Sequence, residues 1–324
     1  VYAADNGAVI SQNSWGNQAP GRTPGSYRDA IDYFIKYAGC DNDGNQLADS
    51  PMKGGVVIIA SGNSNSEERY APGEYGPAIA VNAMGPDFTK AGYSNYGTWT
   101  DITAPGGDQS KFGTKGGVLS TVNADNYDWY NGTSMACPHV SGVAALVVSH
   151  RGGPGFTAAQ LEQYLLAGTH DIDMYNPGYE GKLGAGYIDA YLALTLENKN
   201  KAPEAPKFLP EKSKENDFLS ATIYWQVPKD ADDGAPSKYE LYISEKPLDK
   251  SNYTKGRRIG NQSGFVSGMN KEAGEEMSFD VFGLKHSTTY YFAIVAIDRW
   301  GLKSAPAFMA VSYTHLRAHE TPEH

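Results

Sequence analysis

The first part of the chain alternates short, almost purely apolar runs with stretches of helical periodicity. Val56–Ala60 (VVIIA) and Ala78–Met84 (AIAVNAM) are nearly continuous apolar runs, as strands covered on both faces must be. Ala8–Ile10 resembles the core of a third such strand. Helical spacing of apolar residues occurs in Tyr27–Tyr37, Met135–Ser149 and Thr157–Ala167. Strands that alternate with helices predict a parallel sheet with helical crossovers, which is an α/β fold.

The last of these helices carries a start signal. Thr157 can cap the helix N-terminus, and Gln160 stands three residues later, where it completes a capping box. We therefore expect Thr157 to be the N-cap.

The pattern changes after a polar, proline-bearing linker at residues 197–206. From there apolar and polar residues alternate with a period of two, and turn-rich loops separate the runs. The runs are Ala221–Val227, Lys238–Ser244, Met277–Leu284 and Thr288–Asp298. They predict an antiparallel sandwich over residues 207–312. Residues 313–324 show no strand pattern, and we expect a disordered tail that is not native sequence.

Charge and cysteine usage exclude several classes of protein. The formal net charge of −10 argues against binding to nucleic acid or to anionic membrane surfaces. Cys40 and Cys137 are the only cysteines, so there is neither a disulfide framework nor a cysteine metal motif, and we expect two idle thiols. No apolar run approaches the ~20 residues of a membrane-spanning helix.

One serine stands at the expected start of a buried helix. In NGTSMACPHVSG, Asn131–Gly142, Ser134 follows Gly132, which permits a tight turn, and precedes Pro138, which is tolerated in the first turn of a helix. Helix N-termini present free N–H groups that favour negative charge, so the Ser134 N–H can stabilise an oxyanion. A second donor is Asn63, which follows the apolar strand in IIASGNSN at the carboxyl edge of the expected sheet.

Four segments together resemble the subtilisin-like serine proteases, or subtilases. NGTSMACPHVSG is similar to the nucleophile motif of that family, and VVIIASGN to its strand that ends in the oxyanion-hole Asn. VISQNSWG (Val9–Gly16) resembles its substrate-binding strand, and GAGYIDAYLAL (Gly184–Leu194) its closing segment. The resemblance covers residues 1–196 and implies a partial subtilisin-like parallel sheet with flanking helices, in which the N-terminal strands are missing.

The resemblance implies a role for each residue of these motifs. Ser134 would be the catalytic nucleophile and Asn63 the oxyanion-hole donor of a serine endopeptidase that cleaves proteins or peptides. The residues implied to bind substrate are Ser14, Trp15, Gly16, Ala60, Ser61, Gly62, Asn131 and Thr133. Trp15 has a second interpretation, as a core aromatic beside the sheet.

The resemblance also bears on cofactors and location. The chemistry would require no cofactor, and the protein would be secreted, periplasmic or displayed on the cell surface. Structural calcium is possible, but no site is assignable and we name no metal ligand. Asp41 and Asp43 in CDNDGNQ have a calcium-like composition, and a solvated loop is the favoured explanation for them.

The histidine and aspartate with which the family activates its serine are missing from this sequence. Neither a His-Gly-Thr-His nor an Asp-Thr-Gly or Asp-Ser-Gly stretch occurs in the 324 residues. His139 lies in the same helix as Ser134, His150 and His170 are expected at helix ends, and His286 belongs to the sandwich, so none is a credible base.

Two explanations are open, a fragment of a protease or a true pseudo-enzyme. The start of the chain inside a helical pattern favours a fragment. In both cases we expect this chain by itself to be inactive, because the triad works as a unit. A fragment would also expose an apolar sheet edge, and we expect it to aggregate or to bind hydrophobic dye.

Residues 207–312 resemble a fibronectin type III module, through YWQVP on an early strand and GLKHSTTYYFAIVAIDRWGLKS near the end. Such a module would act as a spacer or dock an unknown surface partner. A rival hypothesis is a non-catalytic surface protein that binds peptides or glycans on a protease-like scaffold. Upstream coding sequence with the family's Asp and His motifs would favour the protease, and a start codon directly before Val1 the binding protein.

Overall fold

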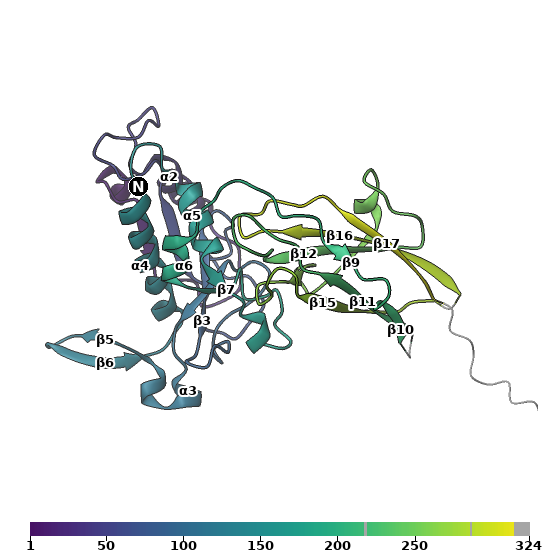
Figure 1. Cartoon of the computed structure of the whole chain (residues 1–324). Coiled ribbons are helices and arrows are strands. Elements are labelled where there is room, and N and C mark those ends of the chain that lie inside the picture. The colour runs from purple at the N-terminus through teal and green to yellow at the C-terminus, as the bar shows by residue number, and fades with distance from the viewer. Residues whose placement is uncertain (217–218, 286, 314–324) are drawn as a thin grey trace, which may run out of the picture. The chain divides into compact units, whose positions relative to one another are not determined.

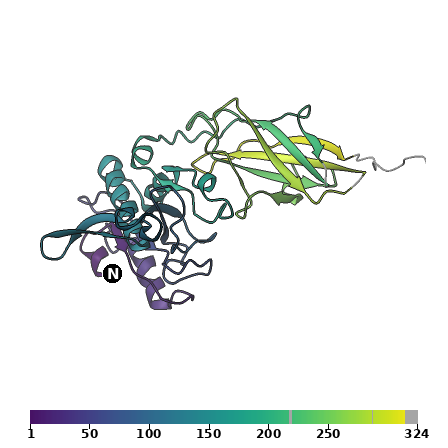
Figure 2. The same cartoon turned by 90° about the horizontal axis from the view of Figure 1, so that it is seen from below.

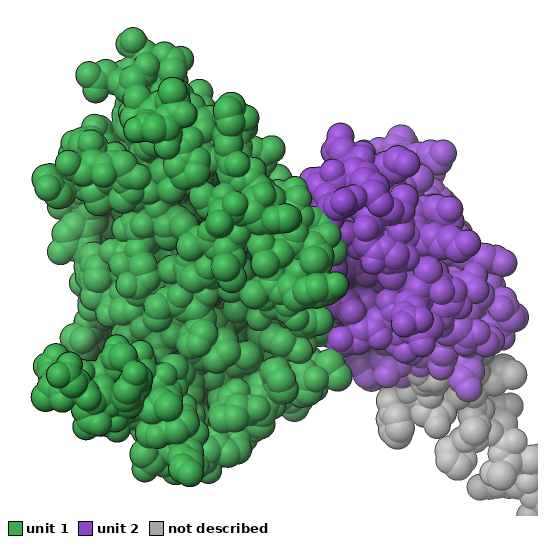
Figure 3. Space-filling model, turned by 60° about the vertical axis from the view of Figure 1, so that its left-hand side comes forward, with its two compact units in different colours: residues 1–196 green, residues 197–324 purple. Residues whose placement is uncertain are grey.

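The computed structural model describes residues 1–216, 219–285 and 287–313. It divides the chain into two compact units, Val1–Leu196 (unit 1) and Glu197–His324 (unit 2), which are coloured separately in Figure 3. His286 and, apart from Tyr313, the expected tail lie outside the described residues. None of the helices within those described ranges is long and apolar enough to cross a membrane.

Unit 1 is built around a six-stranded sheet in the order β1-β2-β3-β4-β8-β7. Strands β1 to β4 and β8 pair in parallel, and β7 runs antiparallel to β8. The strands are β1 (Ile10–Asn13), β2 (Val56–Ala60), β3 (Ile79–Met84), β4 (Ile102–Pro105), β7 (Thr169–His170) and β8 (Tyr187–Ile188). The helices are α1 (Tyr2–Asp5), α2 (Gly25–Tyr37), α3 (Gln109–Phe112), α4 (Thr133–Arg151), α5 (Ala158–Ala167) and α6 (Ala190–Thr195). This is the α/β architecture that the alternating pattern predicts.

A separate hairpin of unit 1 precedes α4. Strands β5 (Val118–Val122) and β6 (Asn126–Tyr130) pair only with each other and project away from the main sheet (Figure 1). The chain passes from β6 through a two-residue turn directly into α4.

The apolar runs are continuous because both faces of the sheet are covered. Ile58 of β2 packs in one cluster with Val140 of α4, whereas its neighbours Val57 and Ile59 pack in a second cluster with Phe34 of α2. Every residue of β2 and β3 is buried. Full burial of an aliphatic side chain contributes about 1.5–3 kcal/mol, so this double covering is the main stabilisation of unit 1.

Two local predictions are wrong. The first strand is Ile10–Asn13 instead of Ala8–Ile10, because β1 lies at the edge of the sheet and is only partly buried, so its residues are partly polar. Pro138 is the sixth residue of α4 and not in its first turn. Since proline has no N–H, the carbonyl of Ser134 lacks its usual helical donor, and it accepts a hydrogen bond from Ser14 Oγ at 2.7 Å.

Unit 2 contains two antiparallel sheets around one core (Figures 1 and 2). In the first, β10 (Lys214–Asn216), β11 (Ser220–Gln226) and β15 (Glu276–Phe282) follow one another, and β9 (Lys207–Phe208) pairs with β11. The second has the order β13 (Arg257–Ile259), β12 (Lys238–Ser244), β16 (Thr288–Ile297) and β17 (Ala307–Tyr313), with β14 (Val266–Ser267) beside β12. Trp225, Tyr239 and Phe292 are fully buried in the shared core. Each of the four predicted alternating runs is a strand.

Candidate active site

The loop after β2 meets the start of α4 beside Ser134. Asn63 Oδ1 accepts two hydrogen bonds from Thr133, one from its N–H at 2.9 Å and one from its hydroxyl at 2.8 Å. The Gly62 N–H lies 3.3 Å from the same hydroxyl oxygen. Asn63 and Ser134, which the sequence places 71 positions apart, are thereby joined through the residue that precedes the serine.

Two nitrogen donors, together with Met135 Sδ, lie near one point above Gly132. A carbon atom added to Gly132 would lie 3.6 Å from the Ser134 backbone nitrogen and 3.7 Å from Asn63 Nδ2. Because Asn63 Oδ1 is occupied by Thr133, its NH₂ group is the end that faces this space. Preorganised donors aimed at one point are the geometry that stabilises a developing oxyanion.

The hydroxyl of Ser134 has no imidazole beside it in the described part of the chain. Ser134 Oγ donates to the carbonyl of Ser14 at 3.3 Å. His139 Nδ1 lies 2.8 Å from the carbonyl of Met135 along the same helix. His150 is exposed in the last turn of α4. Among the described residues, no hydrogen bond joins the side chain of His139 or His150 to Ser134.

His170 does not lie at a helix end as expected. It belongs to β7, and its Nε2 lies 2.9 Å from Asp189 Oδ2. This contact is partly exposed and belongs to the pairing of β7 with β8. The reason for the wrong prediction is that α5 stops at Ala167 and the chain turns at once into a strand. His286 lies outside the described residues.

Six of the eight residues implied to bind substrate lie at the ends of two neighbouring parallel strands. Ser14, Trp15 and Gly16 come directly after β1 and are exposed. Trp15 is half exposed, its Nε1 donates to Asn13 Oδ1 at 3.1 Å, and its ring meets Tyr27 edge-on with centroids 5.6 Å apart. The alternative interpretation of Trp15 as a core aromatic is therefore wrong.

The other implied wall follows β2 and is more deeply placed. Ala60 and Ser61 are buried, and Gly62 is half-buried. Asn131 is half-buried in the turn after β6. Thr133 is fully buried, and its backbone N–H and its hydroxyl both donate to Asn63 Oδ1. Its position is that of a side chain that orients Asn63.

Sequence reasoning missed Asn95, which shapes the loop of Asn63. This side chain is fully buried; its Nδ2 donates to the carbonyl of Ser61 at 2.9 Å, and its Oδ1 accepts from the N–H groups of Ser64 and Ser66. Gly62 has φ +108°, and a Cβ there would lie 2.4 Å from Asn95 Nδ2, so only glycine fits. An Asn within a turn-rich run gives no sequence signal for such a role.

Tyr93 is a second missed residue, on the opposite side of the turn. Its hydroxyl donates to the carbonyls of Gly106 and Gly107 at 2.9 and 2.7 Å, and the Gly132 N–H donates to the same Gly106 carbonyl at 3.0 Å. Burial raises the pKa of Tyr93 above its ordinary value, so the hydroxyl keeps its proton. It fixes the turn from which Ser134 emerges.

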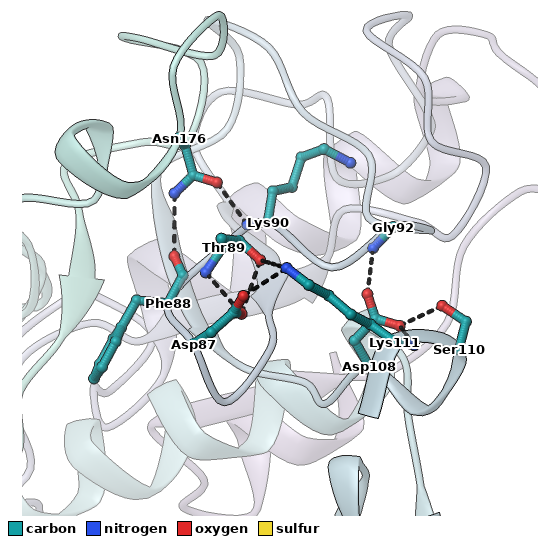
Figure 4. Close-up of polar contacts among 9 residues, drawn as sticks. All are labelled: Asp87, Phe88, Thr89, Lys90, Gly92, Asp108, Ser110, Lys111 and Asn176. Carbon is teal, nitrogen blue, oxygen red and sulfur yellow. Dashed lines mark hydrogen bonds and ion pairs between the residues drawn. The ribbon is translucent and has the colours of Figure 1, made fainter. Parts of the chain in front are cut away.

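Polar contacts of Lys90 and Asp108 join segments that are far apart in the sequence, and Figure 4 shows those with Asn176 and Gly92. The Lys90 ammonium donates to Asn65 Oδ1 at 2.7 Å and to two backbone carbonyls, and its backbone N–H donates to Asn176 Oδ1 at 2.7 Å. Asp108 Oδ2 accepts from the Gly92 N–H at 2.9 Å. Burial lowers the pKa of Lys90 to about 8. The Lys90 ammonium thereby holds Asn65, two residues after Asn63.

The calcium-like segment and the cysteines have ordinary surroundings. Asp41 Oδ1 accepts from the N–H groups of Asp43 and Asn45 at 2.9 and 2.8 Å, and these bonds, those from Asn45 first, hold the pKa of Asp41 below its usual value. The carboxylate thus closes a turn of its own exposed loop. Cys40 and Cys137 are both free thiols.

The first part of the chain matches a known family of proteins. A model of the subtilase family, a family of peptidases, matches residues 1–186, more than half of the 324-residue chain. The chain belongs to the subtilase family.

Individual relatives match this chain over a part of their own length. A thermophilic serine proteinase of Bacillus sp. (strain AK1) is 36% identical over 149 residues, which are 46% of this chain and 30% of that protein. An extracellular basic protease of Dichelobacter nodosus is 32% identical over 181 residues, 52% of this chain and 28% of that protein. A solved protease structure from Pseudoalteromonas arctica PAMC 21717 is 33% identical, covers 58% of this chain and 50% of its own, and has a TM-score of 0.46. The chain thus spans less than a third of the length of these two curated relatives.

Proposed function

We propose that the protein to which this chain belongs is a serine endopeptidase that cleaves peptide bonds through an acyl-enzyme on Ser134. The observation that supports this most directly is that the backbone nitrogen of Ser134 and Asn63 Nδ2 lie near the same point above Gly132. In this proposal, both nitrogens would donate to the oxyanion of a tetrahedral intermediate formed on Ser134 Oγ. Membership of the subtilase family supports the same reaction.

In this mechanism Ser134 Oγ bonds to the scissile carbonyl carbon as its proton passes to a base. The carbonyl oxygen takes up the negative charge and is stabilised by Asn63 Nδ2 and the Ser134 N–H. The C–N bond then breaks, the amine leaves with the proton, and water releases the acyl group by the reverse steps. Thr133 keeps the Asn63 amide turned the right way, and Ser14 anchors the carbonyl of Ser134.

The base and its orienting carboxylate are proposed to come from sequence outside these 324 residues. The family's His and Asp motifs are absent here, and Ser134 Oγ bonds only to a backbone carbonyl among the described groups. Without a base the hydroxyl is a weak nucleophile. We therefore propose that this chain alone hydrolyses peptides very slowly.

We propose that an extended peptide lies between the segments that follow β1 and β2. Ser14–Gly16 and Ala60–Gly62 end adjacent parallel strands and offer backbone groups to such a peptide. Exposed Trp15 is available for an apolar side chain of the substrate. Asn131 stands at the turn before Ser134 and would contact the residues beyond the cleaved bond.

The remaining assignments follow from the same proposal. Relatives named as extracellular support a secreted or surface-displayed protein. Residues 1–196 would be the peptidase part, 197–206 a linker and 207–312 a fibronectin type III-like module that spaces the enzyme or docks it to a surface partner. The reaction itself would use no cofactor.

A fluorophosphonate probe tests the nucleophile directly. An activated serine displaces fluoride and forms an Oγ–P bond, so the protein that includes the sequence before Val1 should be labelled. Ser134→Ala should abolish labelling, and Ser141→Ala, in the same helix, should leave it unchanged. Labelling of Ser134→Ala equal to the parent would exclude Ser134. An unlabelled parent would overturn the proposal in favour of the non-catalytic peptide- or glycan-binding protein.

A further inference from the structure

Unit 2 carries four aspartates on two adjacent loops. Asp230, Asp232 and Asp233 follow β11 in the segment DADDG, and Asp298 follows β16. We call these four residues the aspartate cluster. Asp233 accepts hydrogen bonds from the backbone N–H of Arg299 and from the indole N–H of Trp300, so the two loops lie side by side. The cluster lies entirely within unit 2 and plays no part in the proposed peptidase chemistry.

One oxygen of each key carboxylate is used to fold its own loop. Asp230 Oδ1 accepts from the N–H groups of Asp232 and Asp233 at 2.7 and 3.1 Å. Asp298 Oδ1 accepts from the N–H groups of Trp300 and Leu302 at 2.9 and 2.7 Å. The two carboxylates are therefore fixed in orientation before any ligand arrives.

The other oxygen of each carboxylate, Oδ2, is buried and accepts no hydrogen bond within the described residues. Asp230 is 6% exposed and Asp298 1% exposed, and the Oδ2 atoms of both have no hydrogen-bond partner among the described residues. Asp232 Oδ1 is a third buried oxygen of the cluster without a partner in the described chain. An unpaired buried carboxylate is costly, so such oxygens call for a ligand.

The Oδ2 atoms of Asp230 and Asp298 accept no hydrogen bond from a basic side chain of the described residues. Arg299 interacts with Asp233, whose two oxygens already accept from the Trp300 indole N–H at 3.2 Å and the Arg299 backbone N–H at 3.0 Å. Asp230 and Asp298 thus each keep one buried carboxylate oxygen that accepts no hydrogen bond within the described part of the chain.

We propose that Asp230 and Asp298 are the two carboxylate ligands of a Ca²⁺ site that joins the loop after β11 to the end of β16. Within the described residues no group of three or more His, Cys, Asp and Glu side chains is arranged to hold a metal ion. The site therefore takes two side-chain ligands and completes its coordination with backbone carbonyls and water. All available donors are hard oxygens, which suit Ca²⁺ and its flexible coordination. Asp232 adds negative charge beside the ion.

The alternative is that Asp230 and Asp298 share one proton and bind no ion. This is the behaviour of paired carboxylates at close range. The two possibilities differ at neutral pH, because an ion would displace that proton and stabilise unit 2 in a concentration-dependent way.

Terbium luminescence distinguishes them, since Tb³⁺ replaces Ca²⁺ at oxygen sites and Trp300 is a built-in sensitiser. The Trp300 N–H bonds to Asp298 and its indole to Asp233, so an ion at Asp298 lies close to the ring. With the whole 324-residue chain at pH 7.5, we expect Tb³⁺ emission on excitation of tryptophan, and Ca²⁺ up to about 10⁻³ M, the range for extracellular modules, should remove it.

Matched variants make the test specific. Asp298→Asn and Asp230→Asn keep an oxygen that can accept the loop N–H groups, and both should lose at least tenfold in affinity for Tb³⁺. Asp249→Asn, an exposed aspartate of the same unit, should bind as the parent does. Ca²⁺ should raise the melting temperature of the parent and of Asp249→Asn but not of Asp298→Asn. Emission that Ca²⁺ does not remove, or equal Ca²⁺ stabilisation of Asp298→Asn, would overturn the site in favour of the shared proton.

Discussion

At the scale of single residues, the candidate site depends on polar side chains that orient other polar groups. Thr133 occupies the oxygen of Asn63, and this leaves the NH₂ end for the space above Gly132. Pro138 frees the carbonyl of Ser134, and Ser14 takes up that acceptor. Each contact spans a long stretch of sequence, so the geometry of Ser134 is set by residues from three separate segments.

The first prediction concerns the donor role of Asn63. In the protein that includes the catalytic base, Asn63→Ala should lower kcat by about a hundred- to a thousandfold and change KM little, because the lost interaction is made in the transition state. That magnitude is known from a subtilisin, a member of the same family. Peptide hydrolysis at saturating substrate measures it. Asn123→Ala, exposed in the β5–β6 hairpin, is the control; a loss shared by both variants would contradict the role.

A second prediction concerns Asp101, whose pKa is raised to about 7, chiefly by burial. Its Oδ2 accepts from the Ala80 N–H at 2.7 Å. Since the folded state holds this proton more tightly than the unfolded state, Asp101 stabilises unit 1 below about pH 4. That contribution is lost as the pH rises through 7 and amounts to at most about 4 kcal/mol.

Asp101→Asn should therefore have a free energy of unfolding close to the parent at pH 4 and higher than the parent at pH 8. Asparagine keeps an oxygen for the Ala80 N–H and cannot ionise. Urea unfolding at both pH values measures the difference. Asp49→Asn, which is exposed, should show no such pH dependence. A variant that is less stable than the parent at pH 8 would show that the charged form is tolerated.

At the scale of elements, sequence patterns predicted a structural feature correctly where the contact joins residues that are close in the sequence. The capping box at α5 is confirmed: Thr157 Oγ1 accepts from the Gln160 N–H at 3.3 Å, and the Gln160 side chain accepts from the Thr157 N–H at 3.0 Å. Apolar periodicity located α2, α4 and α5 to within two residues. The predicted bounds of edge strand β1 were wrong. This strand pairs with β2 on one side only and is partly exposed, so its residues are not continuously apolar.

The third prediction measures the cap of α5. Thr157→Ala removes the side-chain acceptor of the first turn and should lower the free energy of unfolding by about 0.5–2 kcal/mol. Urea denaturation followed by far-UV circular dichroism is the measurement. Thr98→Ala, an exposed threonine in the loop before β4, should change stability much less. Equal effects of the two substitutions would mean that the cap contributes nothing specific.

At the scale of the whole molecule, unit 1 leaves one region of its sheet open. β1 stands at the end of the strand order, and a cavity of about 410 Å³ lies beside it. Its lining is largely apolar and includes Trp15, Tyr27, Ile31, Phe34, Val57 and Ile59. An open edge next to apolar surface favours association with other chains.

The fourth prediction is that this cavity binds a hydrophobic dye. The 324-residue chain should raise the fluorescence of anilinonaphthalene sulfonate under native conditions. Ala30→Lys puts a charge on the lining and should reduce both the dye signal and aggregation. Ser26→Lys adds the same charge to the exposed side of the same helix and should leave both unchanged. A chain that stays monomeric and does not raise the fluorescence of the dye would contradict the prediction of an open sheet edge.

The sequence by itself determined two buried strands and three helices of unit 1, the change to alternating strands after residue 196, and the resemblance of the motif around Ser134. These features are carried by periodicity and short-range contacts, which a single segment expresses alone. Only the tertiary structure decided that Trp15 is exposed, that Thr133 is buried against Asn63, and that Asn95 and Tyr93 shape the site. The physical reason is that a buried polar group is defined by partners far along the chain, and no local pattern records them.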